Sequence, residues 1–257
     1  MTLLPLQSGI LYGPVNSRRL GKSLGVNLMP GSYKLCSFNC VYCHYGWTKK
    51  QTIDFSKYHE DLPSIDEVVK SIAQALKSSL EFDFLTFSGN GEPTLYPQFT
   101  ELLEEVVRLR NIYRPKVNLA LLSNSTGLVS EDVLLSLSKI DFAFLKLDAG
   151  TEEKFKAINR PARGVNFSEI IGSLCSAKKL YIQTILLEGN PSNVTEDALE
   201  AYFQKISLIQ PEEVHIYSID RPVPDRAIFL VSKDRLGEIA DWGKKETGIE
   251  FKPFYLQ

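Results

Sequence analysis

Six short runs rich in β-branched, aromatic and leucine residues recur along the 257-residue chain, and segments with helical periodicity separate them. Ser64 with Glu67 marks the start of one such segment, and Asn166 with Glu169 marks the start of another. A strand followed by a helix, repeated six times, is typical of parallel βαβ units. Six units are fewer than the eight of a closed barrel, so the sequence predicts an α/β fold, either a partial barrel or an open doubly wound sheet. The predicted strands span 23–29, 82–88, 116–123, 141–148, 180–188 and 213–220.

The composition is that of an ordinary globular protein, with 44% hydrophobic and 23% charged residues. No low-complexity linker divides the chain, so we expect residues 1–257 to form one domain. A net charge of −2 argues against a surface built throughout for nucleic acid. The amino terminus has no charged segment ahead of an apolar run, and no uncharged apolar stretch is long enough to span a bilayer. We therefore expect a cytoplasmic protein with no membrane contact.

The unusual residues of the sequence follow the predicted strands. Three cysteines come after the first strand, and "SGNGEPT" comes after the second. The segments "SNSTG", "DAGTEE" and "DRPVPD" follow the third, fourth and sixth strands. Partial barrels and open α/β sheets both carry their functional groups at the carboxyl ends of the strands. We therefore predict one active site at this end of the sheet.

The segment "KLCSFNCVYCHYG" holds Cys36, Cys40 and Cys43 in the spacing C-x3-C-x2-C. Clustering in one loop argues against a disulfide framework, which would spread its cysteines through a small secreted chain. A structural zinc site needs four ligands, and the nearby candidate, His44, directly adjoins Cys43. Three thiolates suit a 4Fe-4S cluster that leaves one iron open for an outside ligand. A catalytic cluster is favoured, and a non-catalytic metal-binding module remains as the alternative.

The fourth cysteine, Cys175, lies in a segment of helical periodicity. It shares one predicted helix face with Ile170, Ile171 and Leu174. Free cysteine is often buried as a small hydrophobic residue, so we expect Cys175 in the core. A single additional cysteine cannot assemble a second cluster by itself.

The cysteine motif, with Tyr42 before its last cysteine, resembles that of the radical S-adenosylmethionine (radical SAM) superfamily. The segment "SGNGEPTL" is similar to the family's glycine-rich motif after the second strand, although Asn90 separates the two glycines here. The resemblance implies a partial (β/α)6 barrel and a 4Fe-4S cluster. It further implies reductive cleavage of S-adenosylmethionine (SAM) to methionine and a 5′-deoxyadenosyl radical, which abstracts hydrogen from a substrate. An external one-electron donor such as flavodoxin or ferredoxin is the implied partner.

The same resemblance assigns site residues by position. The three cysteines would bind the cluster. Glycines would let the backbone approach the methionine end of SAM, and a carboxylate would accept hydrogen bonds from its ammonium group. Lys146 and Asp148 would face the site as catalytic candidates, although a plain strand end and a helix cap also explain them. The cofactor-binding residues would be Tyr42 near the adenine, Gly89, Gly91 and Glu92 at the methionine amine, and Ser123 and Asn124 near the ribose or carboxylate.

The segments "GPVNSRRLGKSLGVNLMP" and "KLDAGTEEKFKAINRP" resemble the branch that includes the tRNA wyosine-base synthases. Those enzymes use further cysteines for a second cluster, and no cysteine precedes Cys36 here. This difference argues against wyosine chemistry, and the net charge of −2 favours a small-molecule or peptide substrate, bound in part by Gln183 and Tyr217. RNA remains possible if basic residues form one rim. The basic candidates are Arg18, Arg19, Lys22, Lys34, Lys49, Lys50, Arg160, Arg163, Arg221 and Arg226.

Overall fold

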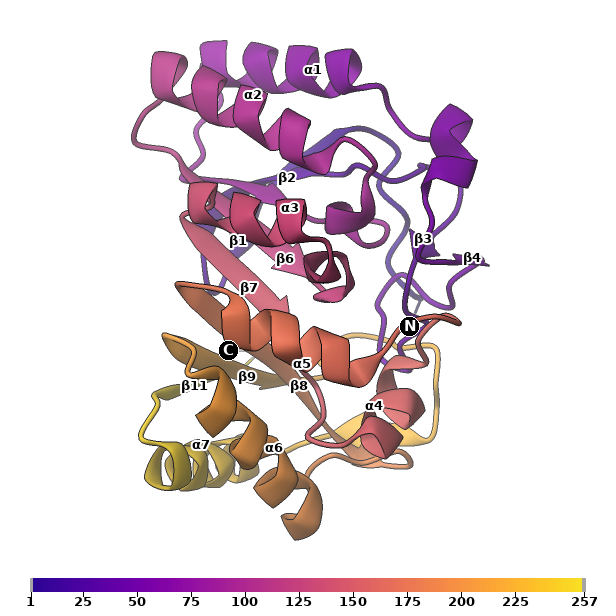
Figure 1. Ribbon diagram of the computed structural model, residues 1–257, viewed down its shortest axis with the longest axis vertical. Helices are drawn as coiled ribbons and strands as arrows, with labels where there is room; N and C mark the ends of the chain where they lie inside the picture. Colours follow the sequence, from indigo (N-terminus) through magenta and orange to yellow (C-terminus); the bar gives the residue numbers. More distant parts are fainter. Residues whose placement is uncertain (1, 256–257) are drawn as a thin grey trace.

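The computed structural model describes residues 2–255, which form a nine-stranded sheet with helices packed along it (Figure 1). The strand order is β1-β2-β5-β6-β7-β8-β9-β11, and β10 pairs with β8. A separate two-stranded ladder joins β3 to β4. The strands are β1 (Leu11–Ser17), β2 (Gly21–Val26), β3 (Leu35–Cys36), β4 (Lys50–Gln51), β5 (Phe84–Phe87), β6 (Asn118–Ser123), β7 (Phe142–Lys146), β8 (Leu180–Gly189), β9 (Glu213–Ser218), β10 (Ile228–Leu230) and β11 (Phe251–Phe254).

All six predicted strands are present, as β2, β5, β6, β7, β8 and β9, and each pairs in parallel with the next. The sheet extends further than predicted. β11 adds a seventh parallel strand beside β9, whereas β1 and β10 pair antiparallel with β2 and β8. The carboxyl ends of the parallel strands point to the side that carries β3, β4 and α4, seen on the right of Figure 1.

Helices follow the strands in the predicted alternation. They are α1 (Ile65–Lys77), α2 (Phe99–Tyr113), α3 (Glu131–Ser136), α4 (Glu152–Asn159), α5 (Phe167–Ser176), α6 (Glu196–Ile209) and α7 (Lys233–Thr247). The predicted capping box is confirmed, since Ser64 accepts from the Glu67 backbone while Glu67 accepts from the Ser64 backbone. Asn166 likewise caps α5 by accepting from the backbone of Ser168 and Glu169. Within residues 2–255, no helix combines the length and apolar character needed to cross a membrane.

The prediction for Cys175 is wrong, because its side chain is exposed. The buried stripe of α5 consists of Phe167, Ile170, Ile171 and Leu174. Cys175 follows Ile171 by four positions, and Ile171 lies at the edge of that stripe rather than at its centre. One further step around the helix therefore places the thiol outside the core.

The turn between β1 and β2 packs against the inner face of the sheet. Leu20 is buried there against Ala120 of β6 and Phe144 of β7. The guanidinium of Arg19 lies over the rings of Phe144 and Tyr217, 5.7 and 5.1 Å from their centroids. This turn therefore fills space inside the curved sheet, below the loops that extend from the carboxyl ends of the strands.

Candidate functional site

The loops that follow β2, β5, β6 and β7 meet around a cavity of about 160 Å³. The cavity lies at the carboxyl ends of the parallel strands, where the sequence predicts the active site. The structure brings ten of the eleven predicted site residues to its wall: Cys36, Cys40, Cys43, Tyr42, Gly89, Gly91, Glu92, Ser123, Asn124 and Lys146. The eleventh, Asp148, is buried behind this wall and holds Tyr42 and Lys146 from there.

The three cysteines of the loop are free thiols, and Cys36 and Cys40 are buried. Burial raises the pKa of Cys36 to about 12 and that of Cys40 to about 11, although Lys34 pulls both in the opposite direction. Binding metal as thiolates would therefore release protons. Asn124 and Asn159 each direct their Nδ2 group at a sulfur, Sγ of Cys36 and Sγ of Cys40 respectively, at 3.6 Å.

The geometry does not favour a single zinc ion. His44 points its Nε2 atom at Asp220, 3.6 Å from Oδ1, so its ring is engaged with another loop. In the part of the chain that the structure describes, no three His, Cys, Asp or Glu side chains surround one ion-sized point. Thiolates that each bind a different iron of a cluster stand further apart than the ligands of one ion. A donor set of three thiolates fits a 4Fe-4S cluster that leaves one iron for an outside ligand.

Lys34 supplies a positive charge beside these thiols. Its side chain is only 5% exposed, and Nζ donates to the backbone oxygen of Gly46 at 3.1 Å. Burial by itself would lower the pKa of Lys34, but attraction to Cys43, Cys36 and Cys40 raises it overall. The sequence suggested that Lys34 belongs to a basic rim. Its side chain instead lies inside the cysteine loop, as a counter-charge to the thiols.

The two glycines of "SGNGEPT" allow close packing against the cysteine loop. A Cβ atom on Gly91 would lie 1.7 Å from the backbone oxygen of Leu35, the residue before Cys36. Gly89 has a φ of +130°, and a Cβ there would lie 2.5 Å from Oδ1 of Asn27. Gly91 thus lets the backbone approach the cysteine loop itself, and Gly89 lets it approach Asn27, the residue after β2. Sequence reasoning did not supply these reasons for the two glycines.

Asn90, the residue that separates the two glycines, is fully buried. Its Oδ1 accepts from the backbone of Gln7 at 2.8 Å, and its Nδ2 donates to the backbone oxygens of Gln7 and Pro30. Asn90, which separates the two glycines in this chain, therefore links the amino-terminal segment to the site.

Glu92 is 1% exposed, and its carboxylate holds the loops after β5 and β6 together. Oε1 accepts from the backbone and hydroxyl of Thr94 and from the Ser123 hydroxyl, while Oε2 accepts from the backbone of Asn124 at 2.5 Å. Burial raises the pKa of Glu92, and these hydrogen bonds only partly offset that effect. Oε2 has one donor where Oε1 has three, so it retains capacity for a further donor at the cavity wall.

Lys146 and Asp148 belong to a buried polar network at the end of β7. Lys146 Nζ lies 3.1 Å from Asp148 Oδ1 and donates to the Tyr217 hydroxyl at 2.9 Å. The Tyr42 hydroxyl donates to Asp148 Oδ2 at 2.5 Å. Burial would lower the pKa of Lys146, but the attraction of Asp148 and the contact with Tyr217 raise it overall. Lys146 is therefore an ammonium ion at neutral pH. The alternative interpretation, a solvated lysine at a plain strand end, is wrong because the Lys146 side chain is only 11% exposed.

Asn159 joins this network to the cysteines, and sequence reasoning missed it. Its Nδ2 donates to Asp148 Oδ2 at 2.7 Å and to the Tyr42 hydroxyl at 3.0 Å, as well as facing Cys40. Its Oδ1 is buried without a hydrogen-bond partner among the described residues. The only sequence signal was its place at the start of the proline loop "NRPARG".

Half of the ten basic candidates cannot belong to a free basic rim. Lys22 pairs with Glu81 near the amino end of β2, whereas the cysteines follow the carboxyl end of that strand. Arg18 pairs with Asp220, and Arg160 pairs with Asp225 at 3.0 Å while covering the Trp47 ring. Arg19 points inward, where its Nη1 donates to Gln183 at 2.9 Å. The residues left exposed without a carboxylate partner in residues 2–255 are Lys49, Lys50, Arg163, Arg221 and Arg226.

The fold and this site define a class of enzyme. Residues 32–206 match the model of the radical SAM superfamily, so the chain belongs to that superfamily. The chain is 34% identical to a UPF0026 protein of Synechocystis sp. over 83% of this chain and 77% of that protein, which places it in the UPF0026 family. It is an enzyme, and the alternative of a non-catalytic module falls away. A radical SAM enzyme uses a 4Fe-4S cluster and SAM, and it needs a reductant.

Two further relatives are much longer than this chain. The chain is 28% identical to a GTPase Obg of Brachyspira hyodysenteriae over 95% of this chain but only 35% of that protein, about a third of its length. It is 24% identical to the SAM-dependent tRNA 4-demethylwyosine synthase of Arabidopsis thaliana over 50% of this chain and 18% of that protein. A solved structure of TYW1 with a lysine-pyruvate adduct is similar in fold, with a TM-score of 0.57 and 16% identity over 88% of this chain and 75% of that one. The predicted partial barrel is thereby confirmed.

Proposed function

We propose that this enzyme binds one 4Fe-4S cluster through Cys36, Cys40 and Cys43 and cleaves SAM there by one-electron reduction. When bound, the cluster and SAM would supply the radical chemistry, a 5′-deoxyadenosyl group able to abstract hydrogen from a substrate. The observation that carries the proposal is the convergence of three thiols, Lys34 and Glu92 on one cavity. The experiment is anaerobic incubation of the reconstituted enzyme with dithionite and SAM. Equal amounts of 5′-deoxyadenosine and methionine support the proposal, and intact SAM refutes it.

The chain's own residues would position the two cofactors. Lys34 offsets the negative charge of the thiolates, and the amides of Asn124 and Asn159 donate to two sulfurs. Glu92 would accept the ammonium group of SAM at Oε2, in a loop fixed by Gly89, Gly91 and Ser123. Tyr42, held by Asp148 and Asn159, would line the adenine side.

Lys146 is proposed to position substrate or cofactor as a cation. The solved structure of TYW1 has a lysine-pyruvate adduct bound. An amine must lose its proton before it can attack a carbonyl. Asp148 lies 3.1 Å from Lys146 Nζ and opposes that loss, so we do not assign Lys146 the role of a nucleophile.

The substrate is proposed to be a small molecule or a peptide. Two of the arginines counted toward an RNA-binding rim have carboxylate partners, and Lys34 is buried. A wyosine-type tRNA reaction is the second candidate, supported by the distant similarity to 4-demethylwyosine synthase. The release of 5′-deoxyadenosine with RNA-free cell extract, compared with purified total RNA, separates the two. Stimulation confined to the RNA fraction would overturn the first candidate.

Three further expectations belong to this proposal. Flavodoxin or ferredoxin would deliver the electron, and the protein would act in the cytoplasm. Residues 1–257 would form one domain, since one buried cluster includes residues from Leu24 in β2 to Phe251 in β11.

Glu92→Gln is expected to weaken SAM binding without loss of iron. The change removes the negative charge but keeps the shape and one acceptor oxygen. Loss of one charge-assisted hydrogen bond corresponds to about 1.5–3 kcal/mol of binding free energy. Anaerobic calorimetric titration with SAM, beside an iron assay, measures both quantities. The matched control is Glu101→Gln on the exposed side of α2, and equal SAM affinity in the two variants would contradict the assigned role.

Lys34→Met is expected to make the cluster harder to reduce, because a buried positive charge beside it is removed. The midpoint potential should fall by about 60 mV or more, the equivalent of a tenfold change for one electron. Anaerobic redox titration followed by electron paramagnetic resonance measures this shift. Lys49→Met removes an exposed lysine near the same loop and should leave the potential unchanged. Identical potentials in both variants would show that Lys34 does not act on the cluster.

A further inference from the structure

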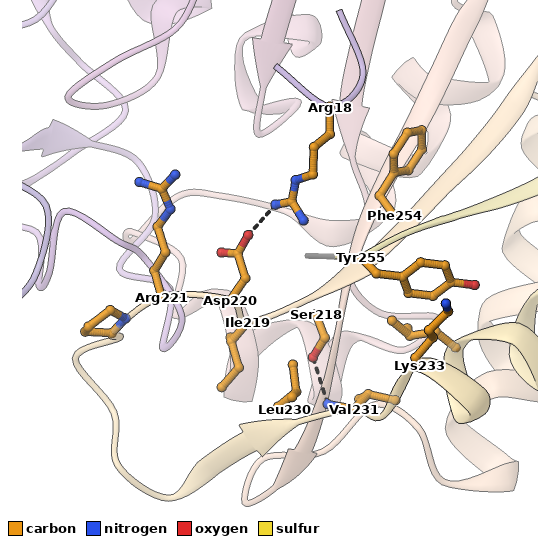
Figure 2. A pocket seen from close by; sticks show the side chains of 12 residues that line it. Arg18, Ser218, Ile219, Asp220, Arg221, Leu230, Val231, Lys233, Phe254 and Tyr255 are labelled. Carbon is orange, nitrogen blue, oxygen red and sulfur yellow. Dashed lines mark hydrogen bonds and ion pairs between the residues drawn. The ribbon is translucent and has the colours of Figure 1, made fainter. Parts of the chain in front are cut away.

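A second cavity, of about 540 Å³, lies at the carboxyl ends of β9 and β11 (Figure 2). We call it the β9–β11 pocket. Residues from the β1–β2 turn, the loop after β9, β10, the start of α7 and the end of β11 form its wall. They are Arg18, Ser218, Ile219, Asp220, Arg221, Pro222, Leu230, Val231, Lys233, Leu236, Phe254 and Tyr255. Its volume falls in the range that small-molecule sites occupy.

Most of this wall is apolar. Figure 2 shows Ile219, Leu230 and Val231 on one side of the pocket and Phe254 and Tyr255 on another. The Ser218 hydroxyl is already satisfied, since it donates to the backbone oxygen of Leu186 and accepts from the backbone of Val231. The pocket can therefore bury an apolar body without leaving that hydroxyl unpaired.

The charged side chains that line the pocket carry a net positive charge. Arg18, Arg221 and Lys233 line the pocket together with a single carboxylate, Asp220, which lies between the two arginines in Figure 2. Asp220 forms its ion pair with Arg18. Among residues 2–255, no carboxylate lies within 4 Å of Arg221 or Lys233, and the Lys233 ammonium lies over the Tyr255 ring at 5.1 Å. Two cations are thus available to a negatively charged group.

The pocket adjoins the cysteine site. Asp220 contacts His44, the residue after Cys43, at 3.6 Å. Tyr217, the neighbour of Ser218, receives the hydrogen bond from Lys146 at the wall of the first cavity. Phe254 of the pocket is the register partner of Tyr217 in the β9–β11 ladder, so their side chains share the inner face of the sheet. A molecule in the pocket would therefore lie beside the cluster loop.

We propose that the β9–β11 pocket binds the substrate, and that the substrate is a small organic anion. Its apolar body would pack against Leu230, Val231 and Phe254, and its negative charge would be attracted by Arg221 and Lys233, which lie on opposite sides of the pocket in Figure 2. The assignment rests on the proposed function, because it takes the adjoining cavity to be the radical site. It goes further by naming the chemical class that the neighbouring residues recognise.

Two fluorescent probes test the pocket directly in the reconstituted enzyme. 8-Anilinonaphthalene-1-sulfonate carries an apolar body with one negative charge, and N-phenyl-1-naphthylamine carries the same body without the charge. The double variant Arg221→Gln, Lys233→Gln should bind the sulfonate at least about tenfold more weakly and the neutral probe with unchanged affinity. Arg226→Gln removes an arginine of the same loop that does not line the pocket and should bind both probes as the wild type does.

Leu230→Trp provides a second variant, because it fills the pocket from a side chain that is already 57% exposed and leaves both cations in place. It should weaken the binding of both probes. Equal sulfonate binding in the double variant and in Arg226→Gln would overturn the proposal, and so would unchanged binding in Leu230→Trp. Displacement of the sulfonate by total tRNA, with a steep salt dependence, would assign the surface to RNA instead.

The failure of this inference can be told apart from failure of the proposed function. The SAM cleavage assay of the wild type decides the latter without any probe. Probe binding as expected together with absent SAM cleavage would refute the radical function and leave an anion-binding pocket. SAM cleavage together with charge-insensitive probe binding would refute the pocket assignment alone.

Discussion

Replacing Cys36, Cys40 or Cys43 by alanine is expected to abolish SAM cleavage. Each thiol would bind a different iron, so the loss of one thiol leaves one iron of the cluster without its protein ligand. Cys40 is the most informative position because it is buried against Asn159 and the Tyr42 network. The measurement is 5′-deoxyadenosine formed per chain after anaerobic reconstitution, together with bound iron and sulfide. We expect product at the background level and iron well below that of the wild type.

Cys175→Ala is the matched control for these variants. Cys175 is exposed on α5, away from the cysteine loop, so its removal should change neither iron content nor product formation. Product formation by Cys40→Ala at the wild-type rate would remove the basis for the whole assignment. An equal defect in Cys175→Ala would show that the losses do not report binding of a cluster by the three cysteines of the loop.

Gly91→Ala should be strongly destabilising. The added methyl group would lie 1.7 Å from the backbone oxygen of Leu35 and 2.8 Å from its carbonyl carbon, and neither backbone atom can rotate away. Gly91 and Leu35 form a parallel bridge, so any shift moves the residue that precedes Cys36. Overpacking of this kind costs about 3 kcal/mol or more in free energy of unfolding. Anaerobic urea denaturation of the cluster-free protein measures the difference.

Gly172→Ala makes the same chemical change where space is open. Apart from its chain neighbours and the backbone of α5 itself, no atom of residues 2–255 lies within 4 Å of a Cβ built on Gly172, in the middle of α5. Alanine is the better helix former, so this variant should gain about 0.5–1 kcal/mol. A Gly91→Ala protein as stable as Gly172→Ala would mean that the loop after β5 does not pack against the cysteine loop as described.

The sheet could be predicted because buried parallel strands and amphipathic helices leave strong periodic signals. The six predicted strands carry continuous apolar runs, and Ser64 and Glu67 mark a helix start by their spacing alone. β11 was missed because Lys252 and Pro253 interrupt its apolar pattern, which an edge strand tolerates. β1 was missed for a similar reason, since it is an outer antiparallel strand with a register shift between Tyr12 and Val15.

The candidate site was predictable where its residues are close in sequence and fall after strands. The cysteine loop and "SGNGEPT" belong to this group. Contacts between distant residues were not predictable in the same way. Asn159 reaches Cys40 across 119 positions, and Arg19 reaches Gln183 across 164. Only the fold brings such pairs together, so the network around Asp148 and the inward turn of Arg19 left no local signal.

The central claim is that three cysteines hold a cluster with one iron open to SAM. Electron paramagnetic resonance of the reduced, reconstituted enzyme before and after addition of SAM tests it most directly. The account predicts about four irons and four sulfides per chain, which is the content of one 4Fe-4S cluster, and a spectrum that changes when SAM is added. One zinc ion per chain, or a cluster spectrum that SAM leaves unchanged, would contradict it.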